Sequence, residues 1–181
     1  MRTKQISFND PLFKTQLAFG GTLMKKAKFR TYRPLDRKKP HHMVLRSTQA
    51  KREWSFTTTA NFKIVNDTLK LCAKKYGVKI IEFAIDGSHI HLFMWLTNRA
   101  LYNRFVRALT GLIAQKITGS LKTKLKTKFW DYRPFTRIVV GWRGYEIARD
   151  YVILNRLEAM GIIDYQKERL KSVYLPFLNT S

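Results

Sequence analysis

Apolar residues recur at intervals of three and four along three segments of the chain, a pattern typical of helices with one buried face. These segments are 61–76, 101–117 and 141–160. The positions expected to face the core in the first two are Phe62, Val65, Leu69, Cys72, Tyr76, Leu101, Phe105, Leu109, Leu112 and Ile113. Gly77 and Gly161 follow the first and last segments and suit the left-handed residue that often ends a helix. The pattern therefore predicts three helices.

Four shorter segments, 42–47, 78–85, 89–96 and 135–140, either alternate polar with apolar residues or are rich in β-branched residues, as strands are. Asp86-Gly87 separates the second from the third and is a strong hairpin signal. The order strand, helix, strand, strand, helix, strand is the split βαβ pattern. We therefore predict an α+β, ferredoxin-like antiparallel sheet with an extra C-terminal helix. Two helices should cover one sheet face and leave the other for the last helix and a substrate.

The third strand places two histidines on one face. Side chains alternate along a strand, so Ile90, Leu92, Met94 and Leu96 share one side, and His89, His91, Phe93 and Trp95 share the other. Two imidazoles at positions i and i+2 can hold one divalent metal ion. A single histidine is usually structural, but such a pair on an apolar strand favours metal binding. His41 and His42 are adjacent and point to opposite faces, so we do not expect them to share a metal.

Composition points to a polyanionic partner. The 181 residues carry a net charge of +23 with 45% hydrophobic residues, enough for one domain with a real core. Nucleic acid is the first candidate partner. An anionic membrane is the weaker alternative, because no apolar run is long enough to span a bilayer and no secretory signal is visible. We expect a basic arm over 1–40, a domain over 41–161 and a tail over 162–181, in a cytoplasmic protein.

Basic residues cluster in ways that suit a phosphate backbone. The predicted DNA contacts are Lys25, Lys26, Lys28, Arg30, Arg33, Lys38, Lys39, Arg46, Lys122, Lys124, Lys126, Lys128, Arg133 and Arg137. The alternatives are a solvated tail for the arm and a solvated loop for the alternating lysines at 122–128. Trp130, Tyr132 and Phe135 are either ordinary core and turn residues or platforms on which unpaired bases stack.

The last predicted helix carries polar groups that complement the histidines. At about 100° per residue, Asn155 lies about 40° from Tyr151, and Glu158 about 20° on the other side. One helix face thus offers a nucleophile and a third metal ligand, and an oxygen beside two imidazoles suits Mg²⁺ or Mn²⁺. Tyr151 could instead be a core tyrosine. Tyr145 is a rival nucleophile that we expect to point to a different face.

The pair His89-Ile90-His91 with the downstream Tyr151 and Asn155 resembles the single-tyrosine HUH transposases of the insertion-sequence-200 type. The nearest resemblance is to the REP-associated tyrosine transposases of bacteria. It extends over about residues 30–163 and includes three further stretches, Arg33-Pro34-Leu35, Phe129 to Phe135 and Tyr151 to Gly161.

The resemblance implies a chemistry. His89 and His91 would hold a divalent metal, Mg²⁺ or Mn²⁺, with Asn155 as a third ligand. Tyr151 would attack a phosphate of single-stranded DNA and form a 5′-phosphotyrosine link, and a reversed step would rejoin strands. Glu158 is not part of the family's pattern and has at most a supporting role. The wider group works as homodimers and recognises DNA hairpins, so the resemblance also implies a bacterial, nucleoid-associated protein. The alternative is a domesticated relative that binds a DNA or RNA hairpin without cutting it.

Overall fold

The computed structural model describes residues 17–21, 32–119 and 128–164. Several expectations lie outside this part of the chain. They concern Lys25, Lys26, Lys28, Arg30, Lys122, Lys124, Lys126 and most of the C-terminal tail.

The described chain forms one five-stranded sheet in the order β1-β5-β2-β4-β3, with every recorded pairing antiparallel. The strands are β1 (Ala18–Phe19), β2 (His41–Arg46), β3 (Val78–Ile85), β4 (His89–Leu96) and β5 (Phe135–Ile138). Without β1, the order β5-β2-β4-β3 is that of the split βαβ unit. The predicted α+β, ferredoxin-like sheet is therefore confirmed.

Three α-helices and two short 3₁₀ turns complete the fold of the described residues. The α-helices are α2 (Thr59–Tyr76), α3 (Tyr102–Thr118) and α4 (Trp142–Ala159), and the 3₁₀ turns are η2 (Arg52–Trp54) and η3 (Arg99–Leu101). Thr58 caps α2 by accepting a hydrogen bond from the Asn61 amide, and Gly77 ends the helix in the left-handed conformation at φ 64°. The Thr58 cap explains why α2 begins at Thr59, two residues before the periodic apolar pattern.

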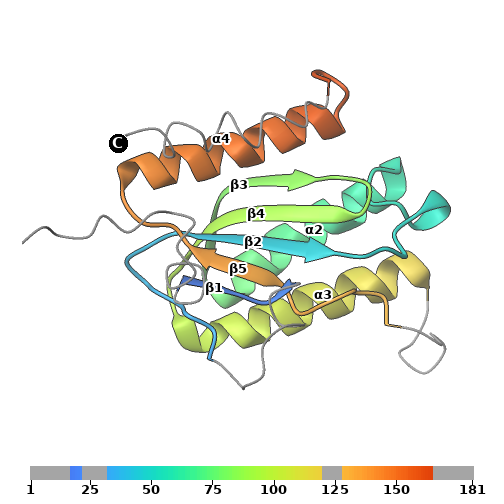
Figure 1. The fold of residues 1–181 in the computed structure, drawn as a ribbon. Helices are drawn as coiled ribbons and strands as arrows, with labels where there is room; N and C mark the ends of the chain where they lie inside the picture. Colours follow the sequence, from blue (N-terminus) through green and yellow to red (C-terminus); the bar gives the residue numbers. More distant parts are fainter. Residues whose placement is uncertain (1–16, 22–31, 120–127, 165–181) are drawn as a thin grey trace, which may run out of the picture.

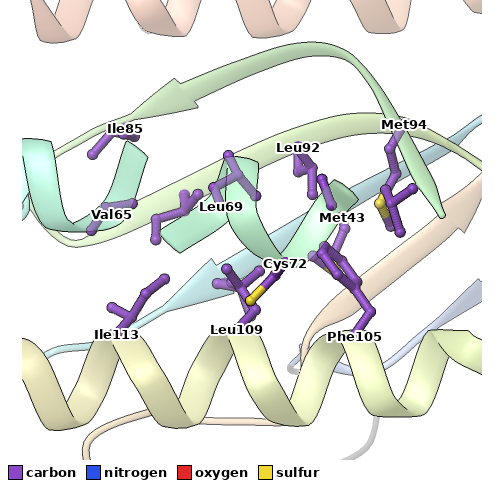
Figure 2. Close-up of a cluster of buried hydrophobic side chains, with 14 of the residues drawn as sticks. Met43, Val65, Leu69, Cys72, Ile85, Leu92, Met94, Phe105, Leu109 and Ile113 are labelled. Atoms are coloured by element: carbon purple, nitrogen blue, oxygen red, sulfur yellow. The ribbon is translucent and has the colours of Figure 1, made fainter. Parts of the chain in front are cut away.

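The main core lies between the sheet and the helices α2 and α3, which cover the same sheet face (Figure 1). Figure 2 shows side chains of both helices meeting those of the strands there. The four aliphatic residues of β4 are at most 2% exposed, as the alternation predicts. Phe62 is an exception to the predicted core, because 44% of it is exposed. It lies in the first turn of α2, where the helical stripe has rotated away from the sheet.

Parts of the segment predicted as an arm belong to the fold. Ala18–Phe19 pairs with β5 at the sheet edge, a two-residue strand too short to show a period. Arg33 donates hydrogen bonds to the Pro134 carbonyl at 2.9 Å and to the Thr136 hydroxyl. Its guanidinium also lies 4.4 Å from the ring centroid of Phe19. This arginine, predicted as a DNA contact, is therefore engaged in holding the N-terminal segment to the sheet.

Among the described residues, helix α4 covers the opposite sheet face (Figure 1). A second, smaller apolar cluster joins them, in which Val152 is the one fully buried residue of α4. The predicted division of the two faces is thus confirmed. No helix among the described residues is long and apolar enough to cross a membrane.

Candidate active site

Strand register places the two predicted metal ligands beside polar residues of β2. In the β2–β4 pairing Val44 lies opposite His91, and Arg46 lies opposite His89. Directly paired residues share a sheet face, so His42, two residues before Val44, lies on the same face as both histidines. This face is the one that α4 covers.

His89 lies at the start of β4, half-buried, with its Nδ1 atom held by the preceding loop. The Ser88 hydroxyl lies 2.9 Å from Nδ1, and the Asp86 carboxylate lies 3.8 Å away. Burial lowers the pKa of His89, and the cationic Arg46 lowers it further. These partners on Nδ1 leave Nε2 as the atom suited to bind a metal, the arrangement usual for ligating histidines.

His91 is 7% exposed and touches a third histidine. Its Nδ1 lies 3.4 Å from Nε2 of His42, and the two rings are stacked with centroids 5.6 Å apart and an interplanar angle of 11°. Burial lowers the pKa of His91 to about 4, with a smaller contribution from His89. Burial also lowers the pKa of His42 to about 3. Both imidazoles are therefore neutral near pH 7, the form that binds metals.

Tyr151 reaches this cluster from α4. Its ring centroid lies 5.6 Å from that of His42 and 5.6 Å from that of His91, nearly perpendicular to both. The structure thus brings the predicted nucleophile next to one of the predicted metal ligands. The rings of His89 and His91 are 6.3 Å apart.

Tyr145 reaches the same sheet face as Tyr151, although the two side chains leave α4 in directions about 120° apart. Its ring packs 5.1 Å from Phe93, on the same sheet face as His91, and stacks against Trp142 at 5.5 Å. A difference of six residues turns a helix by about 120°, which still permits both tyrosines to reach a broad sheet. The ring contacts of Tyr145 are with apolar neighbours, whereas those of Tyr151 are with histidines.

Asn155 lies one turn after Tyr151, but its side chain is directed along its own helix. Its amide nitrogen donates to the Tyr151 carbonyl at 2.6 Å. Its role as a third ligand therefore stays a prediction. Glu158 lies half-buried one turn further on. No three histidine, cysteine or acidic residues within the described ranges gather as a metal site. The donor set beside Tyr151 that suits a divalent ion is thus the pair of imidazoles of His89 and His91.

Arginines flank the histidines on the same face. Arg46 is paired with Asp131 at 3.5 Å, and about half of its side chain is exposed. Arg137 pairs in register with His42 across β2 and β5, and its charge contributes to lowering the pKa of that histidine. Arg46 and Arg137, both predicted as DNA contacts, therefore lie in register with His89 and His42, beside the histidine cluster.

The remaining predicted contacts that the structure describes are scattered. Lys38, Lys128 and Arg133 are exposed. Lys39 is 3.9 Å from Asp36. None of these contacts the histidine cluster in a recorded interaction.

Two of the aromatic residues near β5 have recorded contacts, and the stacking of bases on Phe135 stays a prediction. Trp130 donates its indole N–H to the Thr110 carbonyl at 2.9 Å and packs on Phe56, so it is a core residue. Phe135 lies 6.5 Å from His42 in an edge-on contact, so it belongs to the candidate site.

Sequence comparison identifies the family. The model described as "Transposase IS200 like" matches residues 36–153, which is well over half of the chain. The protein therefore belongs to the IS200-like transposase family, as the histidine pair and the tyrosine helix suggest. No curated protein matches the chain.

A solved structure shares the fold. A REP-associated tyrosine transposase bound to a REP hairpin is similar with a TM-score of 0.56 and 14% identity over 73% of each chain. A protein from Deinococcus radiodurans R1 described as a transposase has a TM-score of 0.43 and 15% identity, over 72% of this chain and 98% of that one. At such identities the first similarity shows a shared fold.

Proposed function

We propose that this transposase-family protein is a metal-dependent single-stranded DNA endonuclease and strand transferase that acts through a 5′-phosphotyrosine intermediate. The observation that carries the proposal is the position of Tyr151, whose ring lies 5.6 Å from that of His91. The phenol ring packs edge-on against an imidazole that is neutral near pH 7 and able to bind a metal. This placement is what a tyrosine nucleophile beside a metal-bound phosphate requires.

His89 and His91 would hold Mg²⁺ or Mn²⁺ through Nε2, with Asn155 contributing its amide oxygen from a different rotamer. A bound divalent ion supplies Lewis acidity, polarising a phosphodiester oxygen and stabilising the charge that develops on it. Two histidines and one amide leave coordination positions open for the substrate.

The phenolic oxygen of Tyr151 would attack the phosphorus as its proton leaves to solvent. The bond from phosphorus to the 3′ oxygen of the preceding nucleotide breaks, and that oxygen takes up a proton. The products are a 5′-phosphotyrosine link and a free 3′-hydroxyl. Attack by a 3′-hydroxyl on the phosphotyrosine reverses the step and joins strands. Arg46 and Arg137 flank the reacting groups, where each can contact a non-bridging phosphate oxygen.

The proposed partner is single-stranded DNA carrying a hairpin. The net charge of +23 favours a polyanion, and the similar solved transposase is bound to a REP hairpin. We propose that the exposed cations Lys38, Lys128 and Arg133 contact the backbone outside the reacting centre. The proposed setting is the bacterial cytoplasm, and a homodimer can form there as in the wider group.

One experiment tests the activity directly. The protein is incubated with Mn²⁺ and a hairpin-bearing single strand from the DNA that flanks its own gene, labelled at either the 5′ or the 3′ end. We expect the 3′ label to become covalently attached to protein and the 5′ label to appear on a shorter strand with a free 3′-hydroxyl. Tight hairpin binding with no cleavage of either strand would instead support a domesticated binding protein.

A further inference from the structure

His42 contacts both a predicted metal ligand, His91, and the predicted nucleophile, Tyr151. Its Nε2 lies 3.4 Å from Nδ1 of His91, and its ring meets that of Tyr151 edge-on at 5.6 Å. It extends from the neighbouring strand β2, on the face that α4 covers. The Phe135 ring also meets the His42 ring edge-on, with the two centroids 6.5 Å apart.

The chemistry of imidazole fixes the direction of the contact with His91. A neutral histidine that binds a metal through Nε2 carries its proton on Nδ1. That proton needs an acceptor, because an unpaired N–H in a residue only 7% exposed is costly. Nε2 of His42 is the side-chain acceptor recorded beside it, at the long end of the hydrogen-bond range. His89 has a corresponding partner in the Ser88 hydroxyl.

We propose that His42 is a positioning residue, which accepts the Nδ1 proton of His91 and thereby directs Nε2 of His91 at the metal. The same ring limits the rotation of the Tyr151 phenol, so one side chain aligns the ligand with the nucleophile. The inference rests on the proposed function, and it assigns His42 a role outside the metal site itself.

A rival arrangement makes His42 a metal ligand. Two ligand nitrogens about 3.4 Å apart also fit a tetrahedral ion with bonds of about 2.1 Å. The rival requires His91 to bind through Nδ1, the atom turned toward His42. The two arrangements predict different numbers of imidazoles on the metal, which can be counted.

The test uses the full-length protein and two substitutions of different chemistry. His42→Gln keeps an acceptor at the position of the imidazole Nε2, and His42→Phe keeps a ring but removes the acceptor. His41→Gln is the matched control, since His41 is buried on the same strand but faces the main core. Mn²⁺ affinity is measured without DNA, from the electron paramagnetic resonance signal of free Mn²⁺. Hairpin binding reports whether each variant is folded.

We expect His42→Phe to weaken Mn²⁺ binding by about 10- to 100-fold, the usual effect of removing the partner of a metal-binding histidine. His42→Gln and His41→Gln should stay near the wild-type affinity, and all three should bind the hairpin. Wild-type affinity in His42→Phe, or an equal loss in His42→Gln, would overturn the inference while leaving the proposed function intact. A wild-type protein that binds no Mn²⁺ would overturn both.

Spin-echo modulation of bound Mn²⁺ counts the coupled imidazoles. Two in the wild-type protein and two in His42→Gln would support the positioning role. Three in the wild-type protein, falling to two in His42→Gln, would overturn it in favour of direct ligation. Nicking at saturating Mn²⁺ gives a further readout, because poor alignment of Tyr151 should lower the rate of His42→Phe even when the metal is bound.

Discussion

Tyr151 is distinguished from the other tyrosine of α4 by its neighbours. Both rings reach the sheet, but Tyr151 meets two histidines and Tyr145 meets Phe93 and Trp142. The neighbours of each ring therefore favour Tyr151 as the proposed nucleophile, whereas the helical angle alone does not separate the two tyrosines.

Replacing Tyr151 with phenylalanine removes one oxygen and little volume, so fold, Mn²⁺ affinity and hairpin binding should persist. Cleavage and the covalent adduct should both disappear, a loss of at least about 1,000-fold if the phenol is the nucleophile. Tyr145→Phe is the matched control on the same helix and should stay active. Peptide mapping of the trapped adduct by mass spectrometry identifies the attached residue. A nucleotide on Tyr145 would contradict the assignment, and cleavage by Tyr151→Phe without an adduct would indicate attack by water.

Buried neutral histidines make the stability of the fold depend on pH. Burial lowers the pKa of His41 to about 4, of His91 to about 4 and of His42 to about 3, each from 6.5. Between pH 6.5 and 4 the unfolded chain binds these protons and the folded chain does not, so stability falls as the pH falls.

Each such histidine contributes up to about 1.4 kcal/mol per pH unit to this dependence. We expect the denaturant midpoint to fall steadily from pH 7 to pH 4.5. His41→Gln removes one titrating group from the core, so its free energy of unfolding should depend less steeply on pH. Unfolding curves of both proteins at pH 7, 6, 5 and 4.5 measure the two slopes. Identical slopes would show that His41 is charged in the folded state.

At the scale of secondary-structure elements, segments with a periodic apolar pattern could be predicted from the sequence, and segments without one could not. Helices and long strands carry repeated apolar positions, which is why α2, α3 and β4 match their predicted bounds closely. β1 has two residues and gains its place from pairing with β5, which leaves no signal in the local sequence.

The same distinction applies to the site. His89 and His91 are recognisable because they share a strand, and Tyr151 because of its place in the last helix. His42 comes from another strand, and only the β2–β4 register brings it to His91. The sequence identified its face correctly in relation to His41, but could not supply the register. The orientation of Asn155 depends on a rotamer, which periodicity does not specify.

Helix α4 is the least firmly attached of the three α-helices. Val152 is its one fully buried residue, whereas α2 buries six residues and α3 buries five. Fewer buried contacts imply a lower free energy of local opening. The proposed nucleophile, Tyr151, therefore lies on the helix that can move most easily relative to the proposed metal ligands.

Val152→Ala tests this attachment. The loss of two methyl groups from a fully buried site should cost about 1–3 kcal/mol, concentrated in the small cluster beneath α4. We expect amide hydrogen exchange of residues 142–159 to accelerate, while α2 and α3 exchange as before, and nicking to slow. Val65→Ala, in the main core, is the matched control and should lower protection of α2 and α3 as well. Uniform acceleration in Val152→Ala would show that α4 opens only with the whole domain.

At the scale of the whole molecule, charge determines how the protein meets DNA. The chain has 35 basic and 12 acidic residues. The recorded ion pairs of the described chain involve few of the basic residues, so a large positive charge remains to attract DNA. Binding of single strands should therefore release counterions, and the logarithm of affinity should fall linearly with the logarithm of salt concentration, with a slope of about −0.7 per phosphate contact. Either particular lysines make those contacts, or no defined set does and the affinity depends on the net charge alone.

Two variants of equal charge separate these cases. The first replaces Lys122, Lys124, Lys126 and Lys128 with glutamine, and the second makes the same change at Lys63, Lys70, Lys74 and Lys75. The second set is exposed on α2, which covers the sheet face opposite the histidines. Affinity for the same hairpin-bearing strand is measured by fluorescence anisotropy from low to moderate salt. If the alternating lysines touch phosphates, the first variant should reduce the steepness of the salt slope by up to about 3, whereas the second should leave it nearly unchanged. Equal reductions in both variants would mean that the DNA responds to the total charge of the protein, with no defined path along the 122–128 segment.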